Sequence, residues 1–276
     1  MMTPRSRLVA AACALATAVA LTGCDLMPNS LEVVTAPSTG VAVETAQTTP
    51  SIAPYRVDSG RPASTASRPT AGSGFATFAG RYGVVAAVCT LGFFARYPDG
   101  HVVVFTAGHC ANLAREAQPD SPPVARYLSG DGYSVPFGEY IKAVSRPTGQ
   151  DLAMIQTVNA RVQPVARAVG PVRGYSTAAD LTTGNPQICI VGSRTGLHCG
   201  VLTYVSAVRV DWAGIPAVEG DSGGPVYAKW DDGSYTAVGV VNGVATRRDG
   251  MGTGRGTGSL IANDITVNHL TLLGTR

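Results

Sequence analysis

Short runs of β-branched and apolar residues, each ended by a turn signal, constrain the fold of this chain more than any other feature. Gly92–Tyr97 and His101–Thr106 flank Pro98-Asp99-Gly100, a pattern typical of a β-hairpin, and Val84–Val88 precedes them. The chain holds 33 Gly and 18 Pro, enough to end a strand every few residues. We therefore predict an all-β fold.

Further strands are expected along the rest of the chain, and they favour one or two β-barrels. They are Gly138–Ser145, Leu152–Val158, Gln187–Val191, Gly200–Val210, Pro225–Trp230 and Tyr235–Val241. A helix is predicted only near the C-terminus, over Asn263–Leu273, with Asn263 or Asp264 as its cap and Gly274 as its terminator.

Residues 1–24 carry the pattern of an export signal. Arg5 and Arg7 precede an apolar run, Leu8–Leu21, which is short for a membrane span. The segment ends in Leu-Thr-Gly-Cys and resembles the bacterial lipobox, which implies that Cys24 is acylated and anchors the exported protein to the outer face of the cell membrane. The alternative is an ordinary cleaved signal peptide in which Cys24 has no role.

Residues 25–74 are rich in Thr, Ser, Pro and Ala and are interpreted as a linker. A flexible coil of roughly 50 residues spans about 40 Å root-mean-square, which lifts a domain clear of a membrane surface. A short pro-segment is the alternative, because Val33–Val43 is compatible with a strand. The folded domain is predicted to cover residues 75–276.

Charge and cysteine content exclude several classes of function. Without Arg5 and Arg7 the 21 basic residues become 19, against 18 acidic ones, so no nucleic-acid partner is expected. Cys13 falls in the signal, and Cys89, Cys110, Cys189 and Cys199 remain as an even set that predicts two disulfides in an exported protein. No C-x-x-C spacing occurs, and we expect neither a metal nor a cofactor.

Three separated segments supply the residue types of a nucleophilic hydrolase. They are Thr106–Cys110, Gln150–Ala153 and Gly220–Pro225. A serine hydroxyl needs an imidazole to accept its proton, and the imidazole needs a carboxylate to fix its tautomer, so Ser222, His109 and Asp151 form a candidate triad. The glycines around Ser222 allow the amides of Gly220 and Ser222 to face one point as an oxyanion hole. Each segment alone is also compatible with a purely structural role.

Together, in the order His, Asp, Ser, these segments resemble the chymotrypsin-like serine peptidases, whose signatures are T-A-A/G-H-C and G-D-S-G-G-P. Thr195–Gly200 further resembles the T-G-x-H-C-G segment of the bacterial branch that contains the streptogrisins and α-lytic protease. The resemblance implies two packed six-stranded antiparallel β-barrels, at about 75–165 and 166–260, with the active site in the cleft between them. It also implies the disulfides Cys89–Cys110 and Cys189–Cys199 and a structural role for His198.

One departure from that branch concerns Asp221, which precedes the nucleophile. The branch pairs this aspartate with an arginine after the first hairpin cysteine, and here that position is Ile190. A buried unpaired carboxylate is costly. We therefore expect a substitute cation, with Arg194 and Arg209 as candidates, or else an oxyanion hole that is only partly formed.

A second departure concerns the substrate pocket. The position six residues before Ser222 is Pro216, not an acid, which disfavours cleavage after Arg or Lys. The strand that resembles the family's S-G-G wall reads Asn242-Gly243-Val244, and Val244 is expected to narrow the pocket toward small or apolar P1 side chains. A local shift of the loop is the alternative.

The sequence thus predicts an extracytoplasmic serine endopeptidase that acts on proteins or peptides as a monomer, without a cofactor. Two rivals stay open. One is a catalytically silent homologue that binds peptides or a partner at the envelope, which the change to Ile190 favours. The other is a regulatory protease that cleaves one envelope partner, suggested by the tether alone.

Overall fold

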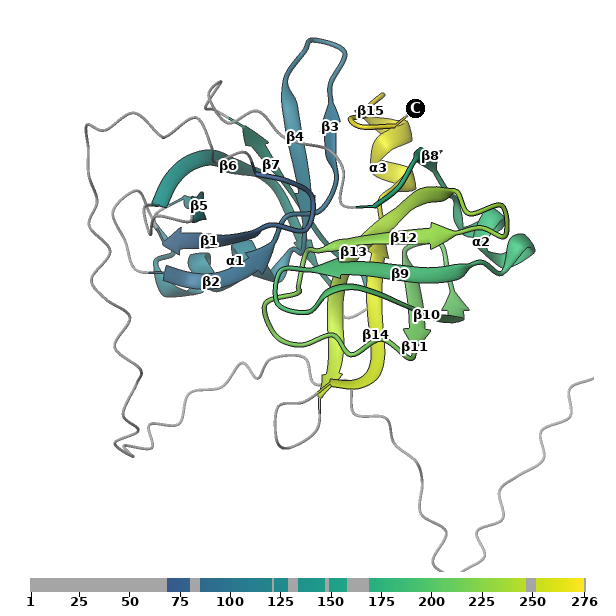
Figure 1. Cartoon of the computed structure of the whole chain (residues 1–276). Coiled ribbons are helices and arrows are strands. Elements are labelled where there is room, and N and C mark those ends of the chain that lie inside the picture. The colour runs from purple at the N-terminus through teal and green to yellow at the C-terminus, as the bar shows by residue number, and fades with distance from the viewer. Residues whose placement is uncertain are drawn as a thin grey trace, which may run out of the picture. The chain divides into compact units, whose positions relative to one another are not determined.

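The computed structural model describes residues 69–79, 85–120, 122–128, 134–146, 149–157, 169–246 and 252–275 (Figure 1). The predicted signal segment, with Cys24, lies outside the described residues, as does the linker up to residue 68. Residues 69–73 pack on the domain, because Ala71 is buried and Gly72 N donates to Leu91 O at 2.7 Å. The described domain therefore begins a few residues before the predicted start at 75.

The first sheet has eight strands in the order β15-β3-β4-β7-β6-β5-β1-β2, and each pair of neighbours is antiparallel. The final short strand returns from the C-terminus to the edge of this sheet, beside β3. The strands are β1 (Gly74–Ala79), β2 (Val85–Thr90), β3 (Phe94–Arg96), β4 (Val102–Thr106), β5 (Pro123–Leu128), β6 (Ser134–Ser145), β7 (Asp151–Thr157) and β15 (Thr271–Leu272).

The second sheet closes into a six-stranded barrel, because β12 pairs with β13 as well as with β9. A seventh strand, β8, adds to β13 in parallel. The strands are β8 (Val172–Tyr175), β9 (Gln187–Gly192), β10 (Gly196–Val205), β11 (Arg209–Ala213), β12 (Pro225–Lys229), β13 (Tyr235–Thr246) and β14 (Gly252–Leu260).

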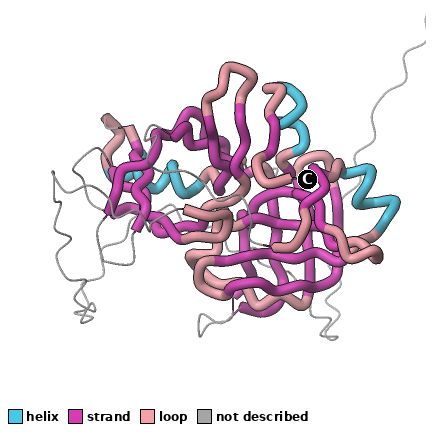
Figure 2. Tube along the Cα trace, turned by 45° about the horizontal axis from the view of Figure 1, so that its top comes forward, coloured by secondary structure: helices cyan, strands magenta, loops and turns pink. Residues whose placement is uncertain are grey.

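The all-β fold is confirmed, and strands dominate Figure 2. The first sheet differs from the expected closed barrel: within the described residues it is an open, curved sheet in which β2 and β3 do not pair. Only three residues separate these strands, and the segment between them already continues the β3–β4 ladder, since Gly92 N donates to Phe105 O at 2.8 Å. The chain therefore bends from β2 into β3 without a turn that would place the two side by side.

The described part of the chain has three short helices, α1 (His109–Ala117), α2 (Ala178–Gly184) and α3 (Ala262–Val267). The predicted C-terminal helix is present as α3, although it ends before Leu273, and the expectation of no other helix was wrong. Helix α2 begins with a capping box in which Thr177 and Asp180 bond each other's backbone, and Asn185 ends it in the left-handed conformation at φ 41°. None of these helices is long and apolar enough to cross a bilayer.

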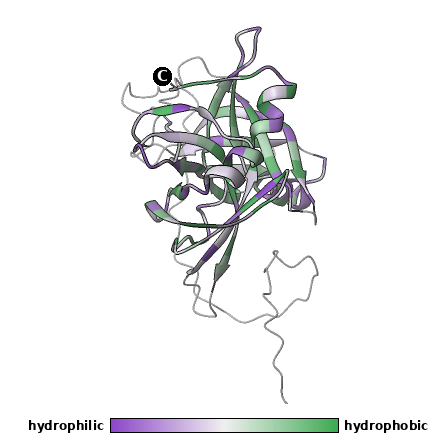
Figure 3. Cartoon of the chain, turned by 90° about the vertical axis from the view of Figure 1, so that its right-hand side faces the viewer, coloured by the Kyte–Doolittle hydropathy of each residue, from purple (hydrophilic) through white to green (hydrophobic). Residues whose placement is uncertain are grey.

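A central core joins the two sheets and fixes the position of the strands that carry the site. Phe105 and Leu152 of the first sheet pack with Tyr227 and Val240 of the second, and the rings of Phe93 and Tyr227 meet edge to face at 4.9 Å between centroids. Hydrophobic residues concentrate on the strands, as the green colour in Figure 3 shows. An ion pair between Lys142 of β6 and the buried Asp264 of α3 adds a polar link across this region.

Candidate active site

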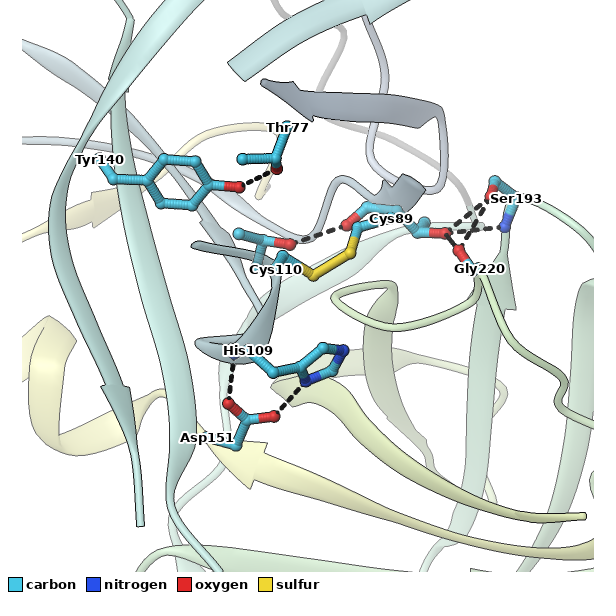
Figure 4. The surroundings of a disulfide bond; sticks show 10 residues. Thr77, Cys89, His109, Cys110, Tyr140, Asp151, Ser193 and Gly220 are labelled. Atoms are coloured by element: carbon cyan, nitrogen blue, oxygen red, sulfur yellow. Dashed lines mark hydrogen bonds and ion pairs between the residues drawn. A yellow bond between two sulfur atoms is a disulfide. The ribbon is translucent and has the colours of Figure 1, made fainter. Parts of the chain in front are cut away.

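His109 and Asp151 come together where α1 begins and where β7 begins. The Asp151 carboxylate accepts two hydrogen bonds from His109, one from the backbone N at 2.7 Å and one from Nδ1 at 2.5 Å (Figure 4). Gly108 permits this approach, because a Cβ there would lie 2.0 Å from Val144 O. With Nδ1–H bound to the carboxylate, Nε2 of His109 is left as the proton acceptor.

Ser222 lies in the turn before β12 and is half-buried. Its carbonyl accepts a hydrogen bond from Thr90 N at 2.7 Å, which ties the nucleophile turn to the end of β2. Gly223 has φ +86°, and a Cβ there would lie 2.0 Å from Thr106 Oγ1, so only glycine fits. The described residues include no hydrogen bond between Ser222 Oγ and His109, a contact that often tightens only when substrate binds.

The expected oxyanion amides are available. Among the described residues, neither Gly220 N nor Ser222 N has a hydrogen-bond acceptor. Gly220 has φ +95°, and its carbonyl lies 2.6 Å from Thr90 Oγ1 and 3.2 Å from Ser193 Oγ. Two hydroxyls from different segments therefore hold this glycine in place, and Figure 4 shows the contact with Ser193.

The disulfide Cys89–Cys110 closes one side of the site, in the pairing that the resemblance implies. Its sulfurs and a ring nitrogen of His109 lie within 4.8 Å of one another. Sulfurs that are bonded to each other cannot act as thiolate ligands, so this group does not constitute a metal site.

Asp221 is wholly buried and is held by neutral donors. Its carboxylate accepts bonds from Arg194 N at 2.9 Å, Thr195 N at 3.3 Å, Thr195 Oγ1 at 2.8 Å and Val218 N at 3.0 Å. The carboxylate lies so close to the β9–β10 turn that a Cβ at Gly192 would be 2.0 Å from Oδ1. Three amides and a hydroxyl satisfy a carboxylate without an opposite charge.

The expected substitute cation is therefore absent from the described surroundings of Asp221. Arg209 pairs instead with Asp211, at 2.6 Å and 2.9 Å. Arg194 contributes its backbone N–H, while its side chain lies against Gly220. The sequence could not predict this arrangement, because nearly every residue carries a backbone N–H and residue identity does not show which of them bind Asp221.

A pair of substitutions tests this account of Asp221. Thr195→Val removes the hydroxyl donor and is expected to lower the free energy of unfolding by about 1.5–3 kcal/mol, the range for a hydrogen bond to a charged group. Arg194→Ala keeps the backbone donor and is expected to cost no more than about 0.5 kcal/mol. Urea denaturation of both variants, with Thr195→Ser as the conservative control, checks the prediction. An equal or larger loss in Arg194→Ala would contradict it.

The second disulfide, Cys189–Cys199, joins directly opposed residues of β9 and β10 and has the implied pairing. His198 Nε2 lies 2.9 Å from Thr195 O, so the histidine braces the same turn that holds Asp221. This contact agrees with the structural role expected for His198.

The residues predicted to form the substrate pocket lie in three different environments. Pro216 is exposed, and Val244 packs against the apolar core of the closed barrel, opposite Gly256 in the β13–β14 register. The Asn242 side chain is directed to Gly149, Ser259 and Thr257. Sequence reasoning also missed Thr90, Ser193, Thr195 and Ser259, of which only Thr195 lies in a recognised motif.

The chain is similar in sequence to bacterial proteins. No family model matches the chain. It is 29% identical over 168 residues to Serine protease 2 of Streptomyces fradiae, covering 56% of this chain and 86% of that protein. An uncharacterized protein of Mycobacterium tuberculosis is 27% identical over 164 residues, covering 57% of this chain and 68% of the relative.

Solved structures share the fold at low sequence identity. Nocardiopsis protease has a TM-score of 0.52 at 21% identity, over 75% of this chain and 99% of that one. Thermobifida fusca protease A has a TM-score of 0.51 at 19% identity, over 75% and 100%. The chain therefore has the fold of bacterial chymotrypsin-like serine proteases and is similar in sequence to one bacterial serine protease. The resemblance predicted from its motifs is confirmed at this level.

Proposed function

We propose that this protein hydrolyses peptide bonds through a triad of Ser222, His109 and Asp151. The observation that carries the proposal is the pair of hydrogen bonds by which Asp151 holds both the backbone and Nδ1 of His109. This geometry directs the basic nitrogen away from the carboxylate and stabilises the imidazolium that forms when a proton is accepted.

The reaction follows from these positions. Ser222 Oγ attacks the scissile carbonyl and its proton passes to Nε2 of His109, while the amides of Gly220 and Ser222 bind the oxyanion. His109 then gives that proton to the departing amine as the carbon–nitrogen bond breaks, and an acyl ester of Ser222 remains. Water then attacks the ester while His109 takes its proton. The bond between the acyl carbon and Ser222 Oγ breaks, and His109 returns the proton to that oxygen, which releases the carboxylic acid and restores the serine.

The preference proposed for the P1 position is a small or apolar side chain. Val244 stands opposite Gly256, and the buried ring of Trp212 lies behind that glycine, where a Cβ would be 2.8 Å from the indole. We infer that these two strands, β13 and β14, form the walls of the P1 pocket, where a valine and an indole leave little room for a long side chain. Pro216, at the position six residues before Ser222, supplies no acid for a basic P1 residue.

Val244→Gly is expected to widen the pocket. The ratio of kcat/KM for a Phe substrate to kcat/KM for an Ala substrate should rise by about 10–200-fold, the range for a difference of one methylene or more in an apolar pocket. Steady-state kinetics on peptide p-nitroanilides that differ only at P1 measure this ratio, and Val244→Ala is the graded intermediate. An unchanged ratio would exclude Val244 from the pocket wall.

The proposed location is the outer face of the cell membrane, with the domain held by an acylated Cys24. The Leu-Thr-Gly-Cys ending of the signal segment supports this proposal. Mass spectrometry of the protein isolated from the membrane fraction tests it: a lipid-modified N-terminal peptide beginning at Cys24 is expected, and an unmodified Cys24 in a secreted form would overturn it.

A catalytically silent, peptide-binding homologue is the second candidate. The observation that favours it is that the described residues include no Ser222 Oγ–His109 hydrogen bond. Hydrolysis of an unfolded protein substrate by the purified disulfide-bonded domain, lost in Ser222→Ala, supports the protease. Tight binding of peptides without any cleavage supports the silent homologue.

A further inference from the structure

The turn between β6 and β7, which places Asp151 beside His109, is hydrogen-bonded to residues of the second sheet. Between β6 and β7, Arg146 N donates to Gln150 O at 2.8 Å and Gly149 N donates to Arg146 O at 3.0 Å. Gly149 has φ +92°, in the left-handed region that glycine tolerates. These local bonds define the turn but do not fix it against the second barrel.

Ser259 of β14 supplies that second contact. It is wholly buried, and its Oγ accepts a hydrogen bond from Asp151 N at 2.8 Å. The same oxygen lies 3.5 Å from Gly149 O and accepts a bond from Asn242 Nδ2 at 2.8 Å. The first residue of β7 is therefore bonded at its backbone to the second barrel and at its carboxylate to His109 of the first.

Asn242 of β13 completes the arrangement. Its Nδ2 donates to Gly149 O at 3.1 Å as well as to Ser259 Oγ, while its Oδ1 accepts a bond from Thr257 Oγ1. The Gly149 carbonyl fixes which way the amide faces, because a carbonyl oxygen can only accept and must therefore meet the NH2 end. Both amide hydrogens then have acceptors within the protein, and none is left for a substrate.

We propose that Asn242 and Ser259 are positioning residues that hold the Asp151 turn against the second barrel and thereby keep the carboxylate on Nδ1 of His109. This assignment replaces the expected substrate-binding role of Asn242, and it rests on the proposed function of the triad. We call the hydrogen bonds that Asn242 and Ser259 make with this turn the clasp. Every group in it is neutral, so it acts on the position of Asp151 and not on its charge. Loosening it is expected to weaken the His109–Asp151 bond without reshaping the substrate pocket.

The test uses Asn242→Leu, which keeps the number and branching of the side-chain heavy atoms but has no hydrogen-bonding groups, and Ser259→Ala. In proton NMR the His109 Nδ1–H, shielded from exchange by its bond to Asp151, is expected to give a far-downfield resonance in the unmodified protein. That resonance should broaden or disappear in both variants. The chain has four histidines, so His109→Gln suffices to assign the signal. This readout needs no enzymatic activity, so it separates a failure of the clasp from a failure of the proposed function.

Kinetics supply the second measurement. In both variants kcat is expected to fall about 10–100-fold, since small misplacements of a catalytic group cost about 10²-fold. The acid limb of the pH profile of kcat/KM should move to lower pH, because the imidazolium loses stabilisation. KM and the ranking of P1 substrates should stay unchanged.

Thr257→Val, which removes only the hydrogen bond that Asn242 Oδ1 accepts, is a milder variant in case the others do not fold. It should reproduce both effects in weaker form. An unchanged Nδ1–H resonance in folded Asn242→Leu, or a changed P1 ranking with an unchanged acid limb, would overturn the proposal and return Asn242 to the pocket.

Discussion

Asp151→Asn is expected to lower kcat for peptide hydrolysis about 10⁴-fold, because an amide facing Nδ1 favours the wrong tautomer of His109. The carboxylate now accepts bonds from the backbone N and from Nδ1 of this histidine, and asparagine can accept only one of them. Circular dichroism and urea unfolding would show that the variant is folded, and pre-steady-state kinetics with an ester substrate would show whether acylation is the step that slows.

Ser222→Ala and the double variant Asp151→Asn/Ser222→Ala provide the control for this prediction. In a triad, removing one residue already abolishes the rate contribution of the others. The double variant should therefore be no slower than Ser222→Ala alone. A loss that is simply the product of the two single losses would contradict a triad. So would an Asp151→Asn variant with full activity.

Lys142→Met is expected to be strongly destabilising although it lies outside the site, with a loss of about 3–5 kcal/mol in the free energy of unfolding. Asp264 is 2% exposed in its side chain and pairs with Lys142, whose side chain is 33% exposed. The second carboxylate oxygen of Asp264, Oδ2, is buried and has no hydrogen-bond partner in the described structure. Removing the lysine leaves a buried charge without compensation, and equilibrium urea denaturation measures the cost.

The chain offers a matched control in the exposed pair of Arg173 and Asp232, which lie 2.6 Å apart with side chains 61% and 52% exposed. Arg173→Met is expected to leave the free energy of unfolding nearly unchanged, since solvent screens such a pair. The double variant Lys142→Met/Asp264→Leu should recover most of the loss, because an apolar pair of similar volume needs no compensation. Equal losses in Lys142→Met and Arg173→Met would contradict the account.

The fold class could be predicted because hydrophobic runs and turn pairs are local signals. The hairpin around Asp99-Gly100 appears as β3 and β4, and Tyr235–Val241 lies within the longer β13. The predicted strand Gly200–Val210 is two strands, because the chain turns at residues 206–208 between β10 and β11, where Ser206 N donates to Arg209 O at 2.8 Å. That turn contains neither Gly nor Pro, so the sequence carries no signal for it.

The two missed helices have different explanations. Helix α2 carries a readable signal, since Thr177 and Asp180 have the spacing of a capping box. Helix α1 has no such signal: Gly108 is its cap and makes no side-chain bond. Its buried face of small residues, Cys110, Ala111 and Ala114, becomes apolar enough to hold a helix only when β1, β2 and β6 pack against it.

The candidate site also contains one part that the sequence predicts and one part that it does not. The positions of His109, Asp151 and Ser222 follow from motifs, because the reacting groups are side chains. The support of Asp221 by the turn at residues 192–195, and that of Asp151 by Ser259, depends on backbone amides and on segments more than 25 residues apart. Such partners become visible only when the register of the strands is known.

The most direct test of the central claim is covalent labelling of the purified, disulfide-bonded domain with a fluorophosphonate, followed by intact-mass measurement and peptide mapping. We predict a single adduct on Ser222, no adduct in Ser222→Ala, and much slower labelling in His109→Ala at the same probe concentration. Folded protein that takes up no label, or that is labelled equally fast without His109, would contradict the account.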